Sequence, residues 1–168
     1  MTETLTGEEL VAMVERVFQP SAEDHALAIL VDLPDSGAPD TSAWRQRREM
    51  AADWARRLTE KQDRLGMQVD LILYRNPRMN NADLPDRAWL HREPSLPATA
   101  DDLDTADATP FAEVFRAHRV LLAPTQFSAT APLKLAAREF GFRAATMPGF
   151  SPEMIPALRL DYAEINRR

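Results

Sequence analysis

The run of six consecutive apolar residues ALAILV, at 26–31, limits the fold of this chain more than any other feature. Asp32 and Pro34 close the run, which is far too short to span a bilayer as a helix. A strand with apolar side chains on both faces is typical of a parallel sheet that is covered by helices on each side. Further strands are predicted from short apolar segments at 69–74, 120–124 and 142–146. The sequence therefore predicts an α/β fold with a mainly parallel sheet of about four strands.

Amphipathic segments with helical spacing lie between these runs. Thr6 and Glu9 match a capping box ahead of the first segment, and a long segment from about Ser42 is stopped by Gly66. Strands that alternate with helices favour right-handed βαβ units, with helices packed on both faces of the sheet. We expect a single domain over residues 1–168, a three-layer αβα sandwich of the Rossmann-like or flavodoxin-like kind.

The region 76–109 is rich in Pro, Asn and Asp and shows no sustained period. A loop of this length is unusual in a compact domain and predicts a functional flap or a partner surface. A last helix is expected over 156–166. The apolar residues that these two parts would offer to a partner are Leu84, Trp89, Leu90, Leu96, Met154, Leu158, Tyr162 and Ile165. We expect the protein to associate with itself or with a catalytic subunit, the alternative being that these residues pack on their own domain.

Composition excludes several classes of function. The net charge of −6 argues against a nucleic-acid or anionic-membrane partner, because both need a positive surface. The chain has no cysteine, which excludes thiol nucleophiles, disulfides and zinc–thiolate sites and agrees with a cytoplasmic protein. His25, His91 and His118 have no paired ligand spacing, so we expect surface histidines and no metal site. A carboxylate metal site among the aspartates of 101–107 is the less favoured alternative to a solvated loop.

The best candidates for ligand binding follow the first and third predicted strands. In an open parallel sheet, ligands bind beyond the carboxyl ends of the strands, at the point where the strand order reverses. If the order is 2-1-3-4, this crevice lies between the ends of strands one and three. The candidate ligand-binding residues are Asp32, Asp35, Thr125, Ser128 and Thr130. The alternative is that Ser128 and Thr130 cap the following helix and that Asp32 only ends its strand.

The corner ATMPGFSPEM, at 144–153, is either the lip of a ligand site or a chain reversal. It has one glycine, Gly149, and lacks the glycine pattern of a phosphate loop. Glu153 would repel a phosphate from the start of the next helix. The local sequence therefore favours a chain reversal, with Ser151 available as a helix cap.

The segment 120–165 resembles the N-terminal domain of the thermophilic-type aminopeptidases (the aminopeptidase T family) and of the related iron-dependent 2,5-dihydroxypyridine dioxygenases. The resemblance rests on VLLAPTQFSAT, LAAREFGFRAATMPGFSPEM and LDYAEI. The matching residues are Pro124, Thr125, Ser128, Thr130, Gly141, Arg143, the run 145–149, Glu153, Met154, Asp161, Tyr162 and Ile165. Ala131 and Pro132 depart from the polar continuation that the family often carries.

The resemblance implies an accessory domain and no catalytic residue in this chain. The metal ligands of that family lie in a separate C-terminal domain, which would begin where this chain ends. We therefore expect a cleft-covering or oligomerisation domain, with a divalent metal or iron only in a partner or in a C-terminal domain. Two alternatives remain: a stand-alone small-molecule-binding module that uses the crevice, and an unrecognised enzyme that works with Ser128, Asp32 or the histidines.

Overall fold

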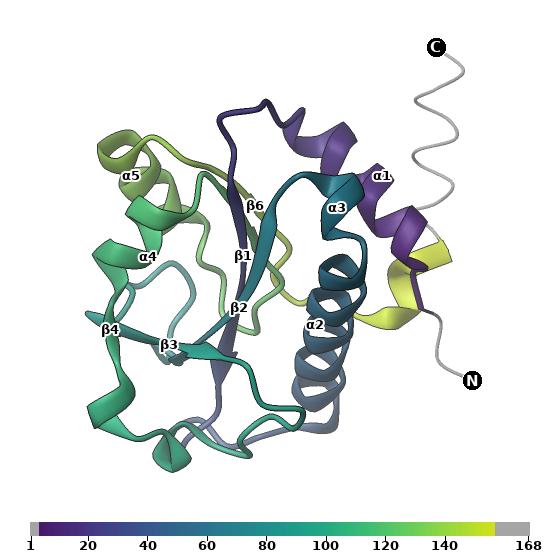
Figure 1. Cartoon of the computed structure of the whole chain (residues 1–168). Coiled ribbons are helices and arrows are strands. Elements are labelled where there is room, and N and C mark those ends of the chain that lie inside the picture. The colour runs from purple at the N-terminus through teal and green to yellow at the C-terminus, as the bar shows by residue number, and fades with distance from the viewer. Residues whose placement is uncertain (1–3, 157–168) are drawn as a thin grey trace.

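The computed structural model of the chain describes residues 4–156, which form an α/β fold around one six-stranded sheet (Figure 1). The strands lie in the order β4-β3-β2-β1-β5-β6. They are β1 (Ala26–Leu33), β2 (Gln68–Arg75), β3 (Arg87–His91), β4 (Thr109–Pro110), β5 (Val120–Ala123) and β6 (Arg143–Thr146). The α-helices are α1 (Gly7–Phe18), α2 (Ser42–Glu60), α3 (Gln62–Leu65), α4 (Phe111–Ala117) and α5 (Thr130–Phe140). Short 3-10 turns lie at η1 (Ala100–Asp102), η2 (Thr105–Asp107) and η3 (Pro152–Met154).

The four strands expected from the apolar runs are β1, β2, β5 and β6. They are parallel to one another and lie in the expected order 2-1-3-4. The expected sheet of about four strands is nevertheless wrong, because β3 and β4 add two antiparallel strands at the β2 edge. The sheet is therefore mixed. β3 lies within the region 76–109 and β4 begins at its last residue, where short segments next to prolines give too weak a pattern to be recognised.

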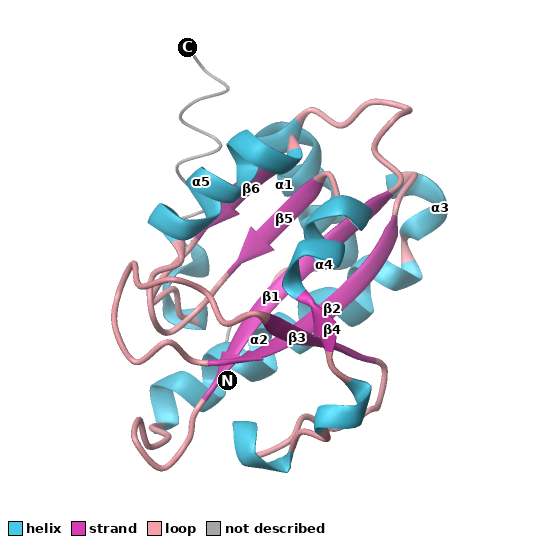
Figure 2. Ribbon diagram, turned by 90° about the vertical axis from the view of Figure 1, so that its left-hand side faces the viewer, coloured by secondary structure: helices cyan, strands magenta, loops and turns pink. Residues whose placement is uncertain are grey.

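Helices lie on both faces of the sheet (Figures 1 and 2). Alternate residues of β1 supply both cores: Leu27, Ile29 and Val31 pack with α1 and α2, whereas Ala28 and Leu30 pack with α4 and α5. This two-sided burial is the reason that the β1 sequence is continuously apolar. None of the helices among the described residues is long and apolar enough to cross a membrane.

The region 76–109 packs on its own domain through several of its apolar side chains, although many of its residues are exposed. Trp89 and Leu96 are partly buried against the α1/α2 core, and Leu84 is partly buried against the α4/α5 core. The indole Nε1–H of Trp89 donates to the carbonyl of Asp104 (2.8 Å). Leu90 remains 44% exposed. The expected helix over 156–166 lies outside the described residues, apart from its first position.

Candidate functional site

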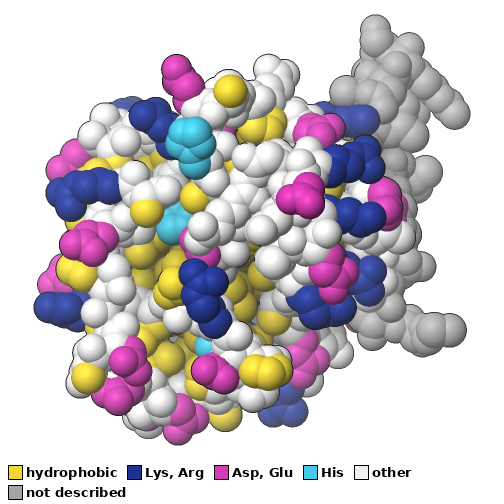
Figure 3. All heavy atoms as spheres, viewed as in Figure 1, with side chains coloured by type: hydrophobic (Ala, Val, Ile, Leu, Met, Phe, Trp, Pro, Cys, Tyr) yellow, Lys and Arg dark blue, Asp and Glu magenta, His cyan; other side chains and the backbone are white. Residues whose placement is uncertain are grey.

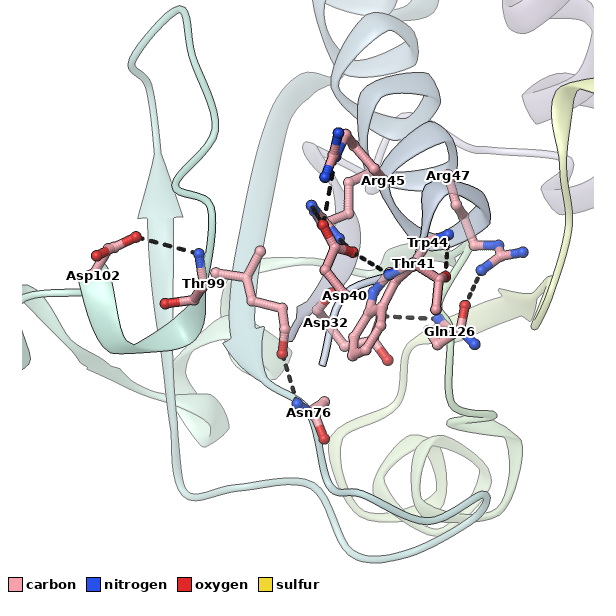
Figure 4. A network of polar contacts seen from close by, with 12 residues as sticks. Asp32, Asp40, Thr41, Trp44, Arg45, Arg47, Asn76, Thr99, Asp102 and Gln126 are labelled. Carbon is pink, nitrogen blue, oxygen red and sulfur yellow. Dashed lines mark hydrogen bonds and ion pairs between the residues drawn. The ribbon is translucent and has the colours of Figure 1, made fainter. Parts of the chain in front are cut away.

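All five candidate residues lie at the edge of the sheet where the parallel strands end. Asp32 is the penultimate residue of β1 and is 1% exposed. Its two carboxylate oxygens accept the backbone N–H groups of Gln126 (2.8 Å) and Phe127 (2.9 Å), in the loop after β5. From α2, the indole N–H of Trp44 donates to the Asp32 carbonyl (2.9 Å; Figure 4). Asp32 therefore fastens the loop after β5 to the end of β1.

Burial raises the pKa of Asp32, although the N–H groups of Gln126 and Phe127 oppose the shift. Tyr74 is the neighbour of Asp32 across β1 and β2 and is fully buried. Burial and the negative charge of Asp32 both raise the pKa of the Tyr74 hydroxyl, which has no hydrogen-bond partner among residues 4–156. Neither group is accessible to solvent, and a ligand would reach the Asp32 carboxylate only after the loop that it holds had opened.

Thr125 is fully buried and holds the same loop from within. Its hydroxyl donates to the carbonyl of Phe127 (2.6 Å), and its own carbonyl accepts the N–H of Gly149 (2.9 Å). Gly149 has φ of 70°, which favours glycine. The corner at 144–153 thus reverses the chain and is attached to the end of β5, and Phe150 continues from it onto Trp54 of α2.

Ser128 and Thr130 precede or begin α5, but neither is its main cap. The N-cap residue is Ala129, which has no side-chain acceptor. The side-chain oxygen of Asn81 instead accepts the N–H of Ala131 (3.0 Å) and lies 3.1 Å from the Ser128 hydroxyl oxygen. The Ser128 hydroxyl oxygen also accepts the N–H of Thr130 (3.3 Å), so the capping alternative holds in part for Ser128, while the acceptor for the N–H of Ala131 comes from a distant segment.

Asp35 lies in the turn after β1, with its side chain 1% exposed. One carboxylate oxygen accepts the N–H groups of Gly37 (3.0 Å) and Ala38 (2.9 Å), and the other lies 3.2 Å from both Arg75 and Arg78. Burial alone would raise the pKa of Asp35, but these hydrogen bonds and charges outweigh it and hold the pKa below its ordinary value. The five candidates thus share one edge without forming one cluster, and each is engaged by the protein itself.

The sequence reasoning missed Arg47, which reaches from α2 into this edge (Figure 4). It is 5% exposed, and its Nε–H donates to the carbonyl of Phe150 (2.7 Å) while Nη1 donates to the side-chain oxygen of Gln126. Burial lowers the pKa of Arg47, and the charge of Asp32 partly offsets this. A signal for it exists in the sequence, because residue 47 falls on the apolar stripe of α2 between Trp44 and Ala51.

A groove of about 930 Å³ runs along the other side of α2, against residues 91–98. Its floor includes Val69 and Leu71. Charged side chains that line it pair with one another, as Arg48 of α2 does with Asp40, which lies ahead of that helix (2.7 and 2.9 Å). Figure 3 shows acidic and basic side chains intermixed over this part of the surface. The groove therefore has no surface of predominantly positive or predominantly negative charge.

Two of the three histidines are not the surface residues that the sequence predicted. His118 is 5% exposed, and its Nε2 lies 2.7 Å from the carboxylate of Asp70 while its Nδ1 lies 2.7 Å from the Val114 carbonyl. Burial alone would raise the pKa of Asp70, but the hydrogen bonds from His118 and Gln68, together with nearby positive charge, outweigh it and the pKa is lowered. His91 is half-buried, and only His25 is exposed. Sequence spacing could not reveal the pair because 48 residues separate its members.

Within residues 4–156, no group of three or more acidic or histidine side chains is placed to hold a metal ion. Comparison with protein-family models, with curated proteins and with solved structures finds no match to this chain.

Proposed function

We propose that this chain is an accessory α/β domain of a metalloenzyme similar to aminopeptidase T or the 2,5-dihydroxypyridine dioxygenases. Such a domain covers a cleft or makes oligomer contacts, and the metal belongs to a partner or to a further domain. The order of the four parallel strands supports assigning it a Rossmann-like or flavodoxin-like architecture. A chain without cysteine needs no oxidising compartment, and a cytoplasmic location is part of the proposal.

The main support for this proposal is that residues of the family-like segment 120–165 form hydrogen bonds within the domain itself. Thr125 is bonded within its loop and to Gly149, and the hydroxyls of Thr130 and Thr146 lie 2.8 Å apart. Polar side chains that are hydrogen-bonded to one another are typical of a structural motif, whereas catalytic groups must be within reach of a substrate. The shared motif therefore supports a role in shaping a domain.

Exposed apolar side chains of the region 76–109 support a contact role for it. Met79 is 65% exposed and Leu90 is 44% exposed. Large apolar side chains that stay exposed beside a folded core are common where another protein binds. We therefore assign the partner surface to this region.

Two measurements on the purified chain test the proposal. Supplied with Zn²⁺, Co²⁺ or Fe²⁺, the chain alone should turn over neither leucine p-nitroanilide nor 2,5-dihydroxypyridine. Sedimentation velocity over a concentration series should show self-association that Leu90→Ser weakens and Leu135→Ser, on exposed α5, does not. Metal-dependent turnover would contradict the non-catalytic role. A strict monomer that also fails to bind a separately supplied metal-binding domain would contradict the contact role.

The second candidate is a stand-alone small-molecule-binding module that uses the crevice beyond β1 and β5. The observation that favours it is the buried guanidinium of Arg47, which lies at this end of the sheet and has no carboxylate partner within residues 4–156. A retained small molecule in native mass spectra of the purified protein would favour this candidate over the accessory domain.

A further inference from the structure

Arg47 and Arg48 are neighbours on α2 and are almost equally buried, at 5% and 4% exposure. Arg48 meets the requirement of a buried cation, because both oxygens of Asp40 bind its two Nη atoms. Arg47 does not, since its hydrogen-bond acceptors in the described part of the chain are a backbone carbonyl and an amide oxygen. A buried charge that lacks an opposite charge in contact is costly, and proteins rarely keep one without a use for it.

The guanidinium of Arg47 keeps donors to spare. An arginine side chain carries five N–H groups. The hydrogen bonds of Arg47 among residues 4–156 use Nε and Nη1, and Nη2 forms none there. The nearest acidic group that acts on it is Asp32, but that carboxylate is directed at the backbone N–H groups of Gln126 and Phe127 and forms no ion pair with Arg47 within 4 Å.

The position of Arg47 is where an α/β sheet binds ligands. β1 is flanked by β2 on one side and by β5 on the other, so the strand order reverses between β1 and β5. Arg47 contacts the loop after β5 through Gln126 and the corner after β6 through Phe150. Both of these residues are only partly buried, so the guanidinium lies directly beneath residues that reach the surface.

We propose that Arg47 binds an oxyanion, the carboxylate or phosphate group of a small molecule, at this reversal point. The planar guanidinium presents parallel N–H donors that match two oxygens of such a group. The anion displaces the Gln126 side chain, which is neutral and partly exposed, and supplies the charge that the buried arginine lacks. This site goes beyond the accessory role, because a cleft-covering domain needs no ligand of its own.

Titration with inorganic phosphate and, separately, with acetate tests the site, at ionic strength held constant with chloride. We expect a saturable rise in melting temperature with at least one of the two anions, and the tighter one identifies the group. Arg47→Met should weaken binding at least about tenfold, because charged hydrogen bonds are lost. Arg45→Met removes the same charge from a 64% exposed position on α2 and should leave binding within about twofold. Gln126→Ala should not weaken binding.

Two results would overturn the proposal. One is equal binding by the wild type and Arg47→Met. The other is a wild-type shift that never saturates, which indicates an adventitious ion only. If Arg47→Met does not fold, an NMR titration of the wild type decides the question. The chemical shift of the Arg47 Nε–H should then change with anion concentration along the same saturable curve as the melting temperature. A resonance that stays fixed while the anion binds elsewhere refutes the assignment to Arg47.

Discussion

Removal of the Asp32 carboxylate should destabilise the domain and loosen the loop after β5. In Asp32→Ala, the N–H groups of Gln126 and Phe127 lose their acceptors. A donor left without an acceptor costs about 1–3 kcal/mol, so two would cost about 2–6 kcal/mol. Burial of the ionised carboxylate is itself unfavourable, as its raised pKa indicates, and relief of that cost reduces the loss. We expect a net loss of about 2–4 kcal/mol in the free energy of unfolding.

Urea unfolding followed by tryptophan fluorescence and by circular dichroism measures this loss. With a slope of about 2 kcal/mol per molar urea for a domain of this size, the midpoint should fall by about 1–2 M. Asp63→Ala, at an exposed position of α3, removes the same charge and should stay within about 0.5 kcal/mol of the wild type. A loss for Asp32→Ala as small as that of the control would refute the fastening role.

The pH dependence of the Asp32→Ala loss has a definite sign. The pKa of Asp32 is higher in the folded than in the unfolded state, so its contribution to stability is complete below the unfolded pKa. The contribution declines as the pH rises through the folded pKa. The cost of Asp32→Ala should therefore be larger near pH 4 than at pH 7. A cost that grows with pH would mean that the N–H groups outweigh burial.

Three further results are expected. His118→Ala leaves the Asp70 carboxylate buried without its main partner and should cost about 3–5 kcal/mol, measured by urea unfolding, whereas His25→Ala at an exposed site should be neutral. Asn81→Ala removes the acceptor at the start of α5 and should cost about 0.5–2 kcal/mol, with faster amide exchange confined to the first turn of that helix; unchanged exchange there would contradict the capping role. The pKa values of Asp35 and Asp70 are lowered on folding, so the stability that these carboxylates supply is present above the ordinary carboxyl pKa. This stability is lost as the pH falls through their folded pKa values. A melting temperature that stays constant on acidification would contradict this expectation.

The sequence predicted the parallel part of the sheet because burial on both faces leaves a continuous apolar run. It also predicted which loops meet, since the carboxyl ends of parallel strands lie at one edge. It did not predict β3, whose alternation is limited to five residues and whose partner is set by tertiary packing. Short edge strands of this kind give almost no local signal.

The roles of the site residues depend on contacts between distant segments. Asn81 is 50 residues from Ala131, and Arg47 is 103 residues from Phe150. Sequence position alone placed Ser128 and Thr130 as caps because they directly precede or begin α5, but the acceptor for Ala131 is an asparagine that approaches through the fold. A charged residue on the apolar face of a helix, as at Arg47, is a local sequence signal of a buried functional side chain.

Hydrogen exchange at the amides of Gln126 and Phe127 tests most directly whether the carboxyl edge of the sheet is held closed by its own side chains. The account predicts that both amides exchange as slowly as those of β1 in the wild type, because Asp32 accepts them in a buried site. In Asp32→Ala, both should exchange fast while the amides of β1 stay protected. Fast exchange of the two amides in the wild type at neutral pH would show that the loop is open and would contradict the account.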